Sequence, residues 1–233
     1  MRYSRLLKFC YIFLSLLLLS CGDANSKSEN PTAKSPISGA ESTTEETKLK
    51  PSILFFGNSL TAGLGVTPEE SFPGRIAHRL DSLGYGYRVI NAGLSGETTA
   101  SGVNRIKWVL RDIPDIFILE LGANDGLRGI SLDETINNLD QIIVTVKETN
   151  PEVTIILTGM QMPPNMGPEY TQGFKQIFPD IARKHQVLLV PFLLEGVGGI
   201  PELNQADGIH QTAKGHLILA QNVWHILEPY LSL

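Results

Sequence analysis

The sequence predicts an α/β fold, a three-layer α/β/α sandwich built around a five-stranded parallel sheet. Five short apolar runs recur along the chain, and continuous apolar runs are typical of strands buried on both faces. Segments with helical periodicity lie between these runs, and strands that alternate with helices indicate a parallel sheet with helices on both faces. Polar and glycine-rich residues follow the apolar runs, at the strand ends where open α/β sheets place their ligand sites.

The first 20 residues differ in composition from this predicted domain. Three basic residues precede Phe9–Leu19, an apolar stretch that is too short for a membrane-spanning helix and typical of a secretory signal peptide. Ser20 and Cys21 then place a small residue before a cysteine, which resembles the lipobox of bacterial lipoproteins. We therefore expect a signal peptide over residues 1–20 and a lipid-modified Cys21 at the mature N-terminus. The alternative is a plain signal peptide in which Cys21 has no role.

Residues 21–50 are predicted to form that lipidated cysteine and a disordered tether. The segment Gly22–Lys50 is rich in Ser, Thr, Glu, Lys, Asn and Pro and has very few large apolar residues. It cannot bury enough surface to offset the entropy lost on ordering. A flexible segment of this length spans roughly 30 Å, enough to lift a domain off a bilayer. We expect an exported bacterial lipoprotein, anchored to a cell-envelope membrane on its periplasmic or surface side.

Cysteine content and charge are consistent with this expectation. Cys10 is the only other cysteine and lies in the segment that would be removed, so no internal disulfide is expected. Removing three basic residues from 19 leaves 16 Lys and Arg against 24 Asp and Glu, a net charge of −8. An acidic surface argues against nucleic acid as a partner.

The folded domain is expected over residues 51–233, without an internal repeat or a second domain. The apolar runs predict strands at Ser52–Phe56, Tyr87–Asn91, Ile116–Leu121, Thr154–Leu157 and Val187–Val190. The helix-periodic segments are Phe72–Leu83, Gly102–Leu110, Leu132–Thr149, Tyr170–Lys184 and Ala213–Leu231. Right-handed crossovers leave few topologies for this order, and a flavodoxin-like sandwich is the simplest.

Two of these helices have a clear apolar stripe, because their apolar residues recur every three or four positions. The first stripe consists of Phe72, Ile76, Leu80 and Leu83. The second consists of Leu132, Ile136, Leu139, Ile143 and Val146. We expect both stripes to face the sheet.

Ser59 is the first candidate for a reactive residue. The strand that begins at Ser52 stops at Gly57, and the hydroxyl follows two positions later, just past the carboxyl end of the strand. Gly57 and Gly63 permit the backbone angles of a tight exit loop. Taken alone, this stretch favours a serine that caps the next helix, and only the rest of the sequence reverses that preference.

Three further loops place polar groups at the same predicted edge. Gly93–Gly96 offers backbone N–H groups that can point into a cleft, or a glycine-rich turn that caps the next helix. Asn124 offers a side-chain amide donor, or a turn residue with local bonds. Asp207 and His210, three residues apart in a turn, can meet directly, so that the carboxylate holds the Nδ1 proton and Nε2 faces outward as a base.

Together these loops bring a hydroxyl, candidate oxyanion donors and an oriented base to one sheet edge. The order Ser, Asp, His also occurs in other α/β ester hydrolases, although the Gly-x-Ser-x-Gly elbow of that fold is absent. No dinucleotide fingerprint, P-loop or metal-ligand spacing is present, so no metal and no cofactor is implied. The other histidines fall in helical patterns and are expected to be structural or exposed.

Four blocks resemble those of the SGNH (GDSL) hydrolases. They are Gly57–Leu60, Gly93–Gly96, Gly122–Asp125 and Asp207–His210. The match extends from about Ser52 to the C-terminus and is closest to the bacterial periplasmic acyl-CoA thioesterase/lysophospholipase/arylesterase branch.

The resemblance implies a role for each matched residue. Ser59 is the nucleophile, His210 the general base and Asp207 its orienting partner. The Ser59 and Gly96 N–H groups and the Asn124 amide form the oxyanion hole. Two positions depart from the family pattern, because Asn58 stands where Asp is usual and Gln211 where Pro is frequent. We expect the first to alter only loop support and the second to matter little.

The expected function is hydrolysis of carboxylic esters or thioesters, such as acyl esters, aryl esters and lysophospholipids, through an acyl-enzyme. The partners would be an acyl ester or lipid substrate and, through the lipid anchor, a membrane. The alternatives are a carbohydrate O-deacetylase on the same fold and a catalytically inactive tethered binding lipoprotein. The loop Met160–Gly167 contains three methionines that either line an adaptable acyl-chain groove or pack onto the core.

Overall fold

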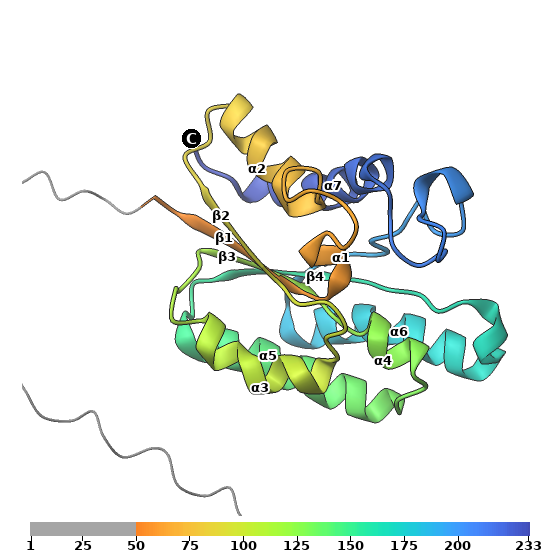
Figure 1. Cartoon of the computed structure of the whole chain (residues 1–233). Helices are drawn as coiled ribbons and strands as arrows, with labels where there is room; N and C mark the ends of the chain where they lie inside the picture. The colour runs from red at the N-terminus through yellow and green to blue at the C-terminus, as the bar shows by residue number, and fades with distance from the viewer. Residues whose placement is uncertain (1–49) are drawn as a thin grey trace, which may run out of the picture. The chain divides into compact units, whose positions relative to one another are not determined.

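The computed structural model describes residues 50–233 (Figure 1). Its sheet contains five parallel strands in the order β2-β1-β3-β4-β5. The strands are β1 (Ser52–Gly57), β2 (Arg88–Gly93), β3 (Ile116–Glu120), β4 (Thr154–Thr158) and β5 (Leu188–Val190). The predicted five-stranded parallel sheet is therefore confirmed, and each predicted strand matches an observed one to within two residues at either end.

Helices cover both faces of this sheet, as the three-layer prediction requires. The longer helices are α2 (Phe72–Ser82), α3 (Thr99–Val109), α5 (Leu132–Thr149), α6 (Pro168–His185) and α7 (Ala213–Leu227). Figure 1 shows α2 and α7 on one face of the sheet and α3, α5 and α6 on the other. The central strands β1 and β3 are buried along their whole length, which explains why their sequences are uninterrupted apolar runs.

Several short elements were not predicted from the sequence. Two are α-helices, α1 (Ser59–Ala62) and α4 (Ala123–Leu127), and three are 3-10 turns, η1 (Pro164–Met166), η2 (Pro201–Leu203) and η3 (Glu228–Tyr230). The last turn ends the predicted final helix early, because α7 stops at Leu227. Helices of four or five residues are too short to show a hydrophobic period, so their sequences contain no helical signal.

The predicted apolar stripes are only partly correct. Phe72, Ile76 and Leu80 are buried, whereas Leu83 follows the end of α2 and is 49% exposed. In α5 the residues Leu139, Ile143 and Val146 are buried, and Leu132 and Ile136 pack at the margin of the core. Leu83 leaves the stripe because it is the C-cap of its helix, where the chain turns away from the core.

The predictions for the N-terminal segment lie outside the described residues. They comprise the signal peptide over residues 1–20, the lipidated Cys21, and the tether up to residue 49. Within residues 50–233, no helix has the length and apolar character needed to cross a membrane.

Candidate active site

Ser59 lies in the tight turn that follows β1. Asn58 is the N-cap of α1, and its Oδ1 atom accepts the backbone N–H of Leu60 at 3.0 Å. Ser59 is the first residue of the helix, and Gly63 ends it in the left-handed conformation with a φ of 75°. The alternative interpretation of Ser59 as a helix cap is therefore wrong, because Asn58 makes the capping bond.

Ser59, His210 and Asp207 form a continuous hydrogen-bonded series. His210 Nε2 lies 3.0 Å from Ser59 Oγ, and His210 Nδ1 lies 2.6 Å from Asp207 Oδ2. Residues 151 positions apart in sequence thus meet at the carboxyl edge of the sheet, as the loop positions predict. The series has the geometry that activates a serine hydroxyl, in which an acid orients a histidine and the histidine accepts the serine proton.

The Asp207 carboxylate is held in its ionised form by the turn that contains it. The His210 ring and the backbone N–H groups of His210 and Ile209 hold the pKa of Asp207 well below its usual range. An ionised carboxylate only accepts hydrogen bonds, so it requires the proton of His210 on Nδ1. Nε2 is then left as an acceptor that faces the Ser59 hydroxyl.

Gln205 connects the histidine turn to the serine turn, and no pattern in the sequence indicated it. Its backbone N–H donates to the His210 carbonyl at 2.7 Å, and its Nε2 donates to the Leu64 carbonyl just after α1 at 2.7 Å. Gly65, which lies against the Gln205 side chain, has a φ of 83°, a left-handed conformation that favours glycine where the two turns meet. The distance between Ser59 and His210 is thus fixed by a direct link between their turns.

Gln211 has more structural contacts than the sequence analysis expected. Its side chain is fully buried, and Nε2 donates to Asn204 Oδ1 and to the Ile209 carbonyl. An isolated β-bridge joins Asn204 and Gln211 and closes the loop that contains Asp207 and His210. The residue that replaces the frequent proline therefore supports this loop by hydrogen bonds.

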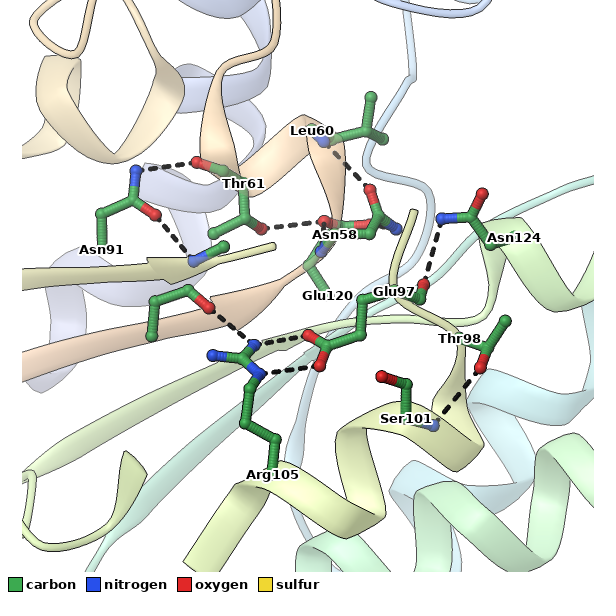
Figure 2. A network of polar contacts seen from close by, with 12 residues as sticks. Asn58, Leu60, Thr61, Asn91, Glu97, Thr98, Ser101, Arg105, Glu120 and Asn124 are labelled. Carbon is green, nitrogen blue, oxygen red and sulfur yellow. Dashed lines mark hydrogen bonds and ion pairs between the residues drawn. The ribbon is translucent and has the colours of Figure 1, made fainter. Parts of the chain in front are cut away.

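The Gly93–Gly96 loop and Asn124 approach the end of β1 from two sides. Leu94 N–H donates to the Gly57 carbonyl at 2.8 Å, which holds the loop beside the serine turn. Asn124, in the first turn of α4, donates from Nδ2 to the Glu97 carbonyl at 3.0 Å (Figure 2). This bond reaches across 27 residues, so Asn124 makes more than the local bonds of a turn residue. It uses only one of the two Nδ2 hydrogens.

A buried ion pair supports the Gly93–Gly96 loop. The Glu97 side chain is buried and pairs with Arg105 of α3 (Figure 2). The Arg105 guanidinium also donates to the Ala92 carbonyl and lies 4.4 Å from the ring centre of Phe56. The next residue, Thr98, caps α3 through its side chain. The glycine-rich loop is therefore fixed on both sides, and the helix cap that follows is a threonine.

A second buried acid, Glu120, lies directly behind the serine turn. It is the last residue of β3, is 1% exposed and accepts hydrogen bonds from Asn58 and Thr61. Sequence reasoning missed both Glu97 and Glu120. For Glu120 the sequence did contain a signal. An acidic residue at the end of an otherwise apolar strand needs a buried partner.

In the described part of the chain, no hydrogen bond joins the remaining predicted candidates to Ser59. Met160 and Met162 are buried, and the sulfur of Met162 lies against Gly126, so these two methionines pack onto the core. His78 and His225 are exposed, His185 bonds Asp140, and His216 is buried against Phe72. Among residues 50–233 no three His, Cys, Asp or Glu side chains are grouped as metal ligands.

The comparisons with known proteins agree with one another. The model of the GDSL-like lipase/acylhydrolase family matches residues 55–218. Esterase TesA of Pseudomonas aeruginosa is 38% identical over 180 residues, which cover 77% of this chain and 89% of that protein. Thioesterase 1/protease 1/lysophospholipase L1 of Escherichia coli is 33% identical, covering 77% of this chain and 85% of that protein. The crystal structure of a TesA matches with a TM-score of 0.73 at 37% identity, covering 76% of this chain and 98% of that one.

Proposed function

Because this chain belongs to the GDSL-like lipase/acylhydrolase family, we propose that Ser59, His210 and Asp207 are the catalytic residues with which it hydrolyses carboxylic esters or thioesters. The chain is a serine ester hydrolase by family. The observation that supports these residues is the hydrogen-bonded series, with 3.0 Å between His210 Nε2 and Ser59 Oγ and 2.6 Å between His210 Nδ1 and Asp207 Oδ2.

The first half of the reaction forms an acyl-enzyme. Ser59 Oγ attacks the carbonyl carbon, and His210 Nε2 takes the hydroxyl proton as the new C–O bond forms. The tetrahedral intermediate collapses when the bond to the alcohol or thiol breaks, and His210 returns the proton to that leaving group. Asp207 stays ionised and stabilises the imidazolium that exists between these two proton transfers.

The second half releases the acyl group to water. His210 takes a proton from a water molecule, whose oxygen attacks the acyl carbon. The bond between that carbon and Ser59 Oγ then breaks, and His210 returns the proton to the serine. This second half releases a carboxylic acid and regenerates the free enzyme. The complete cycle therefore consumes only the ester or thioester and one water molecule.

The negative oxygen of both tetrahedral intermediates needs hydrogen-bond donors. We assign this role to the backbone N–H groups of Ser59 and Gly96 and to the Asn124 side chain. The assignment is supported by the Asn124 amide, which keeps one hydrogen free while the other holds the Glu97 carbonyl. It is also supported by the Gly57–Leu94 bond, which holds the Gly96 loop beside the serine turn.

The names of the relatives indicate the class of substrate. The names of the two relatives include esterase, thioesterase and lysophospholipase, and on that basis acyl esters, acyl thioesters and lysophospholipids are the substrates to test. An inactive binding protein is disfavoured because all members of the hydrogen-bonded series are present and in contact.

The location proposed for this hydrolase is the cell envelope. The basic start, the short apolar stretch and Cys21 support export and lipid modification, and residues 22–49 would tether the domain to the membrane. An envelope location would bring the hydrolase to lipid and acyl ester substrates outside the cytoplasm.

The deciding experiment tests Ser59. Ser59→Ala should abolish turnover of a p-nitrophenyl ester series from acetate to palmitate, while the far-UV circular dichroism and Tm remain those of the wild type. A fluorophosphonate should label Ser59 in the wild type and nothing in the variant, as measured by peptide mass spectrometry. Ser95→Ala is the matched control, because Ser95 is an exposed serine in the neighbouring loop. Label on Ser95, or turnover that survives in Ser59→Ala, would refute the assignment.

A further inference from the structure

The Glu120 carboxyl group is a buried acid that the hydrolytic steps above do not use. It ends β3, which lies between β1 and β4 in the sheet. Burial raises the pKa of Glu120 to about 7, and the hydrogen bonds from Thr61 and Asn58 act against this rise. Among the described residues, all side-chain hydrogen bonds to Glu120 come from these two residues, and no basic side chain pairs with it. The polar contacts of the Glu120 carboxyl group are therefore made with the serine turn.

The three donors to Glu120 flank Ser59 on both sides. Oε1 accepts from Asn58 Nδ2 at 2.7 Å, and Oε2 accepts from the Asn58 backbone N–H at 3.1 Å and from Thr61 Oγ1 at 2.8 Å. Asn58 immediately precedes the serine, and Thr61 follows it by two positions in the same short helix. One carboxylate thus holds the backbone before the nucleophile and the side chain after it.

The packing around this carboxyl group leaves no room for a side chain at Gly57. A Cβ atom on Gly57 would lie 2.1 Å from Thr61 Oγ1 and 2.6 Å from Glu120 Oε2. Both distances are far below van der Waals contact, so only glycine fits between the strand end and the acid. Gly57 is required here by the proximity of Glu120, since its φ angle is not in the left-handed region.

Glu120 also determines which way the Asn58 amide points. Because Oε1 accepts from Asn58 Nδ2, Asn58 Oδ1 faces the helix, where it accepts from Leu60 N–H at 3.0 Å and lies 3.4 Å from Ser59 Oγ. The reversed amide would place its oxygen against a carboxylate and its NH₂ against the Leu60 N–H. Both hydrogen bonds of the Asn58 side chain would then be lost.

We propose that Glu120 is a positioning residue for the nucleophile, which fixes the first turn of α1 and the direction of Ser59 Oγ through Asn58 and Thr61. This inference rests on the proposed function, because it assumes that Ser59 attacks the substrate. The asparagine at position 58 is the complement of this acid. Its NH₂ donates to the Glu120 carboxyl group at 2.7 Å, whereas an aspartate there would place two carboxyl groups side by side that must share a proton.

The first test is the isosteric change Glu120→Gln. The new amide cannot satisfy all three donors, because either its NH₂ faces the Asn58 N–H or it reverses the Asn58 side chain and removes the cap on Leu60. Misplacement of the nucleophile should lower kcat by roughly tenfold to a hundredfold, with KM changed by less than about threefold. The rate at which a fluorophosphonate labels Ser59 should fall in proportion to kcat.

The second test is rescue by the double variant Asn58→Asp with Glu120→Gln. The introduced glutamine can then donate to one oxygen of the introduced aspartate while the other aspartate oxygen caps Leu60. The glutamine oxygen accepts from the backbone N–H of residue 58 and from Thr61. The double variant should recover kcat to within about threefold of the wild type. The single variant Asn58→Asp should be active at neutral pH, where its pair holds one proton, and lose activity at alkaline pH, where the wild type does not.

A matched control separates positioning from general stability. Asp115→Asn makes the same chemical change at the opposite end of β1, where Asp115 Oδ2 accepts the Ser52 N–H at 2.7 Å. It should lower Tm and leave kcat per folded molecule unchanged. Unchanged kcat in Glu120→Gln, or a double variant that regains Tm without regaining kcat, would overturn the role of Glu120. Absence of turnover in the wild type, or its survival in Ser59→Ala, would instead overturn the proposed function along with it.

Discussion

Asn124 has two hydrogens on its side-chain nitrogen, and one of them holds the Glu97 carbonyl at 3.0 Å. That bond fixes the amide plane, so the second hydrogen points in a defined direction and needs no reorganisation when an oxyanion forms. Donors that are oriented before the reaction stabilise a transition state more effectively than mobile ones. At the residue scale, the structural and catalytic roles of Asn124 are therefore compatible, since each uses a different hydrogen.

Replacing Asn124 tests the catalytic hydrogen. Asn124→Ala should lower kcat by roughly 10²- to 10³-fold, on the order of 2.7–4 kcal/mol, with little change in KM, because the oxyanion exists only in the transition state. Steady-state kinetics and a thermal melt on the same preparation measure the two effects separately. Asn222→Ala is the control, because Asn222 also donates its amide to backbone carbonyls, at Leu193 and Glu195, but far along the chain from the serine turn. If Tm falls by several degrees while kcat stays within about threefold, Asn124 supports only the loop.

At the scale of secondary structure, the sequence predicted the elements that have a period and missed those that depend on a buried partner. The strand around Ile118 and the helix around Leu139 were recognised because burial imposes an apolar run on one and a helical stripe on the other. The helices α1 and α4 were missed, because each is held by contacts from distant residues, such as the bond between Asn58 and Glu120.

The candidate active site likewise contains residues that the sequence indicated and residues that depend on distant partners. Ser59, Asp207 and His210 could be proposed from the sequence because strand ends in a parallel sheet share one edge. Glu97 and Gln205 could not, because their partners are 8 and 141 positions away and no local pattern joins them. For Glu120 the sequence indicated that a buried partner was needed, but not that this partner lay 62 positions away. Buried polar side chains show their purpose only when their partners are known.

His216 joins α7 to α2 and gives the fold a measurable dependence on pH. It is 1% exposed, its Nδ1 accepts the Phe72 N–H at 3.1 Å, and its ring stacks on Phe72. Burial, together with the nearby Arg75, lowers the pKa of His216 to about 4. The unfolded chain binds a proton at this histidine below about pH 6.5, and the folded chain does not until about pH 4. The free energy of unfolding should therefore fall as the pH is lowered through this window.

Urea unfolding between pH 7.5 and 4.5 measures this effect. The contribution of His216 to the fall should be roughly 1–3 kcal/mol. His216→Asn is the informative variant, since its oxygen can still accept the Phe72 N–H but cannot be protonated. The variant should lose that part of the pH dependence, whereas His225→Asn, at an exposed position of the same helix, should keep it. Equal pH dependence in the wild type and His216→Asn would show that other groups destabilise the fold in acid.

At the scale of the described domain, its first residues and the proposed catalytic residues lie at opposite ends of β1. Residue 50 precedes the first residue of β1, whereas Ser59 follows its last residue, Gly57. A strand of this length spans about 20 Å. The proposed N-terminal anchor would therefore join the domain at the end of β1 opposite the proposed catalytic residues.

The proposed membrane attachment should therefore be separable from catalysis. Cys21→Ser should move the protein from the membrane fraction to the soluble fraction, because an acylated N-terminal cysteine carries several chains and binds far more strongly than one chain does. The specific activity on a soluble p-nitrophenyl ester should stay unchanged, since position 21 precedes β1 by more than thirty residues. Cys10→Ser is the control, because Cys10 lies in the segment that would be removed, and this variant should fractionate like the wild type.

A mature N-terminus other than Cys21, found by mass spectrometry, would refute the anchor. A soluble Cys21→Ser protein with reduced turnover of the soluble ester would instead show that the tether acts on the site.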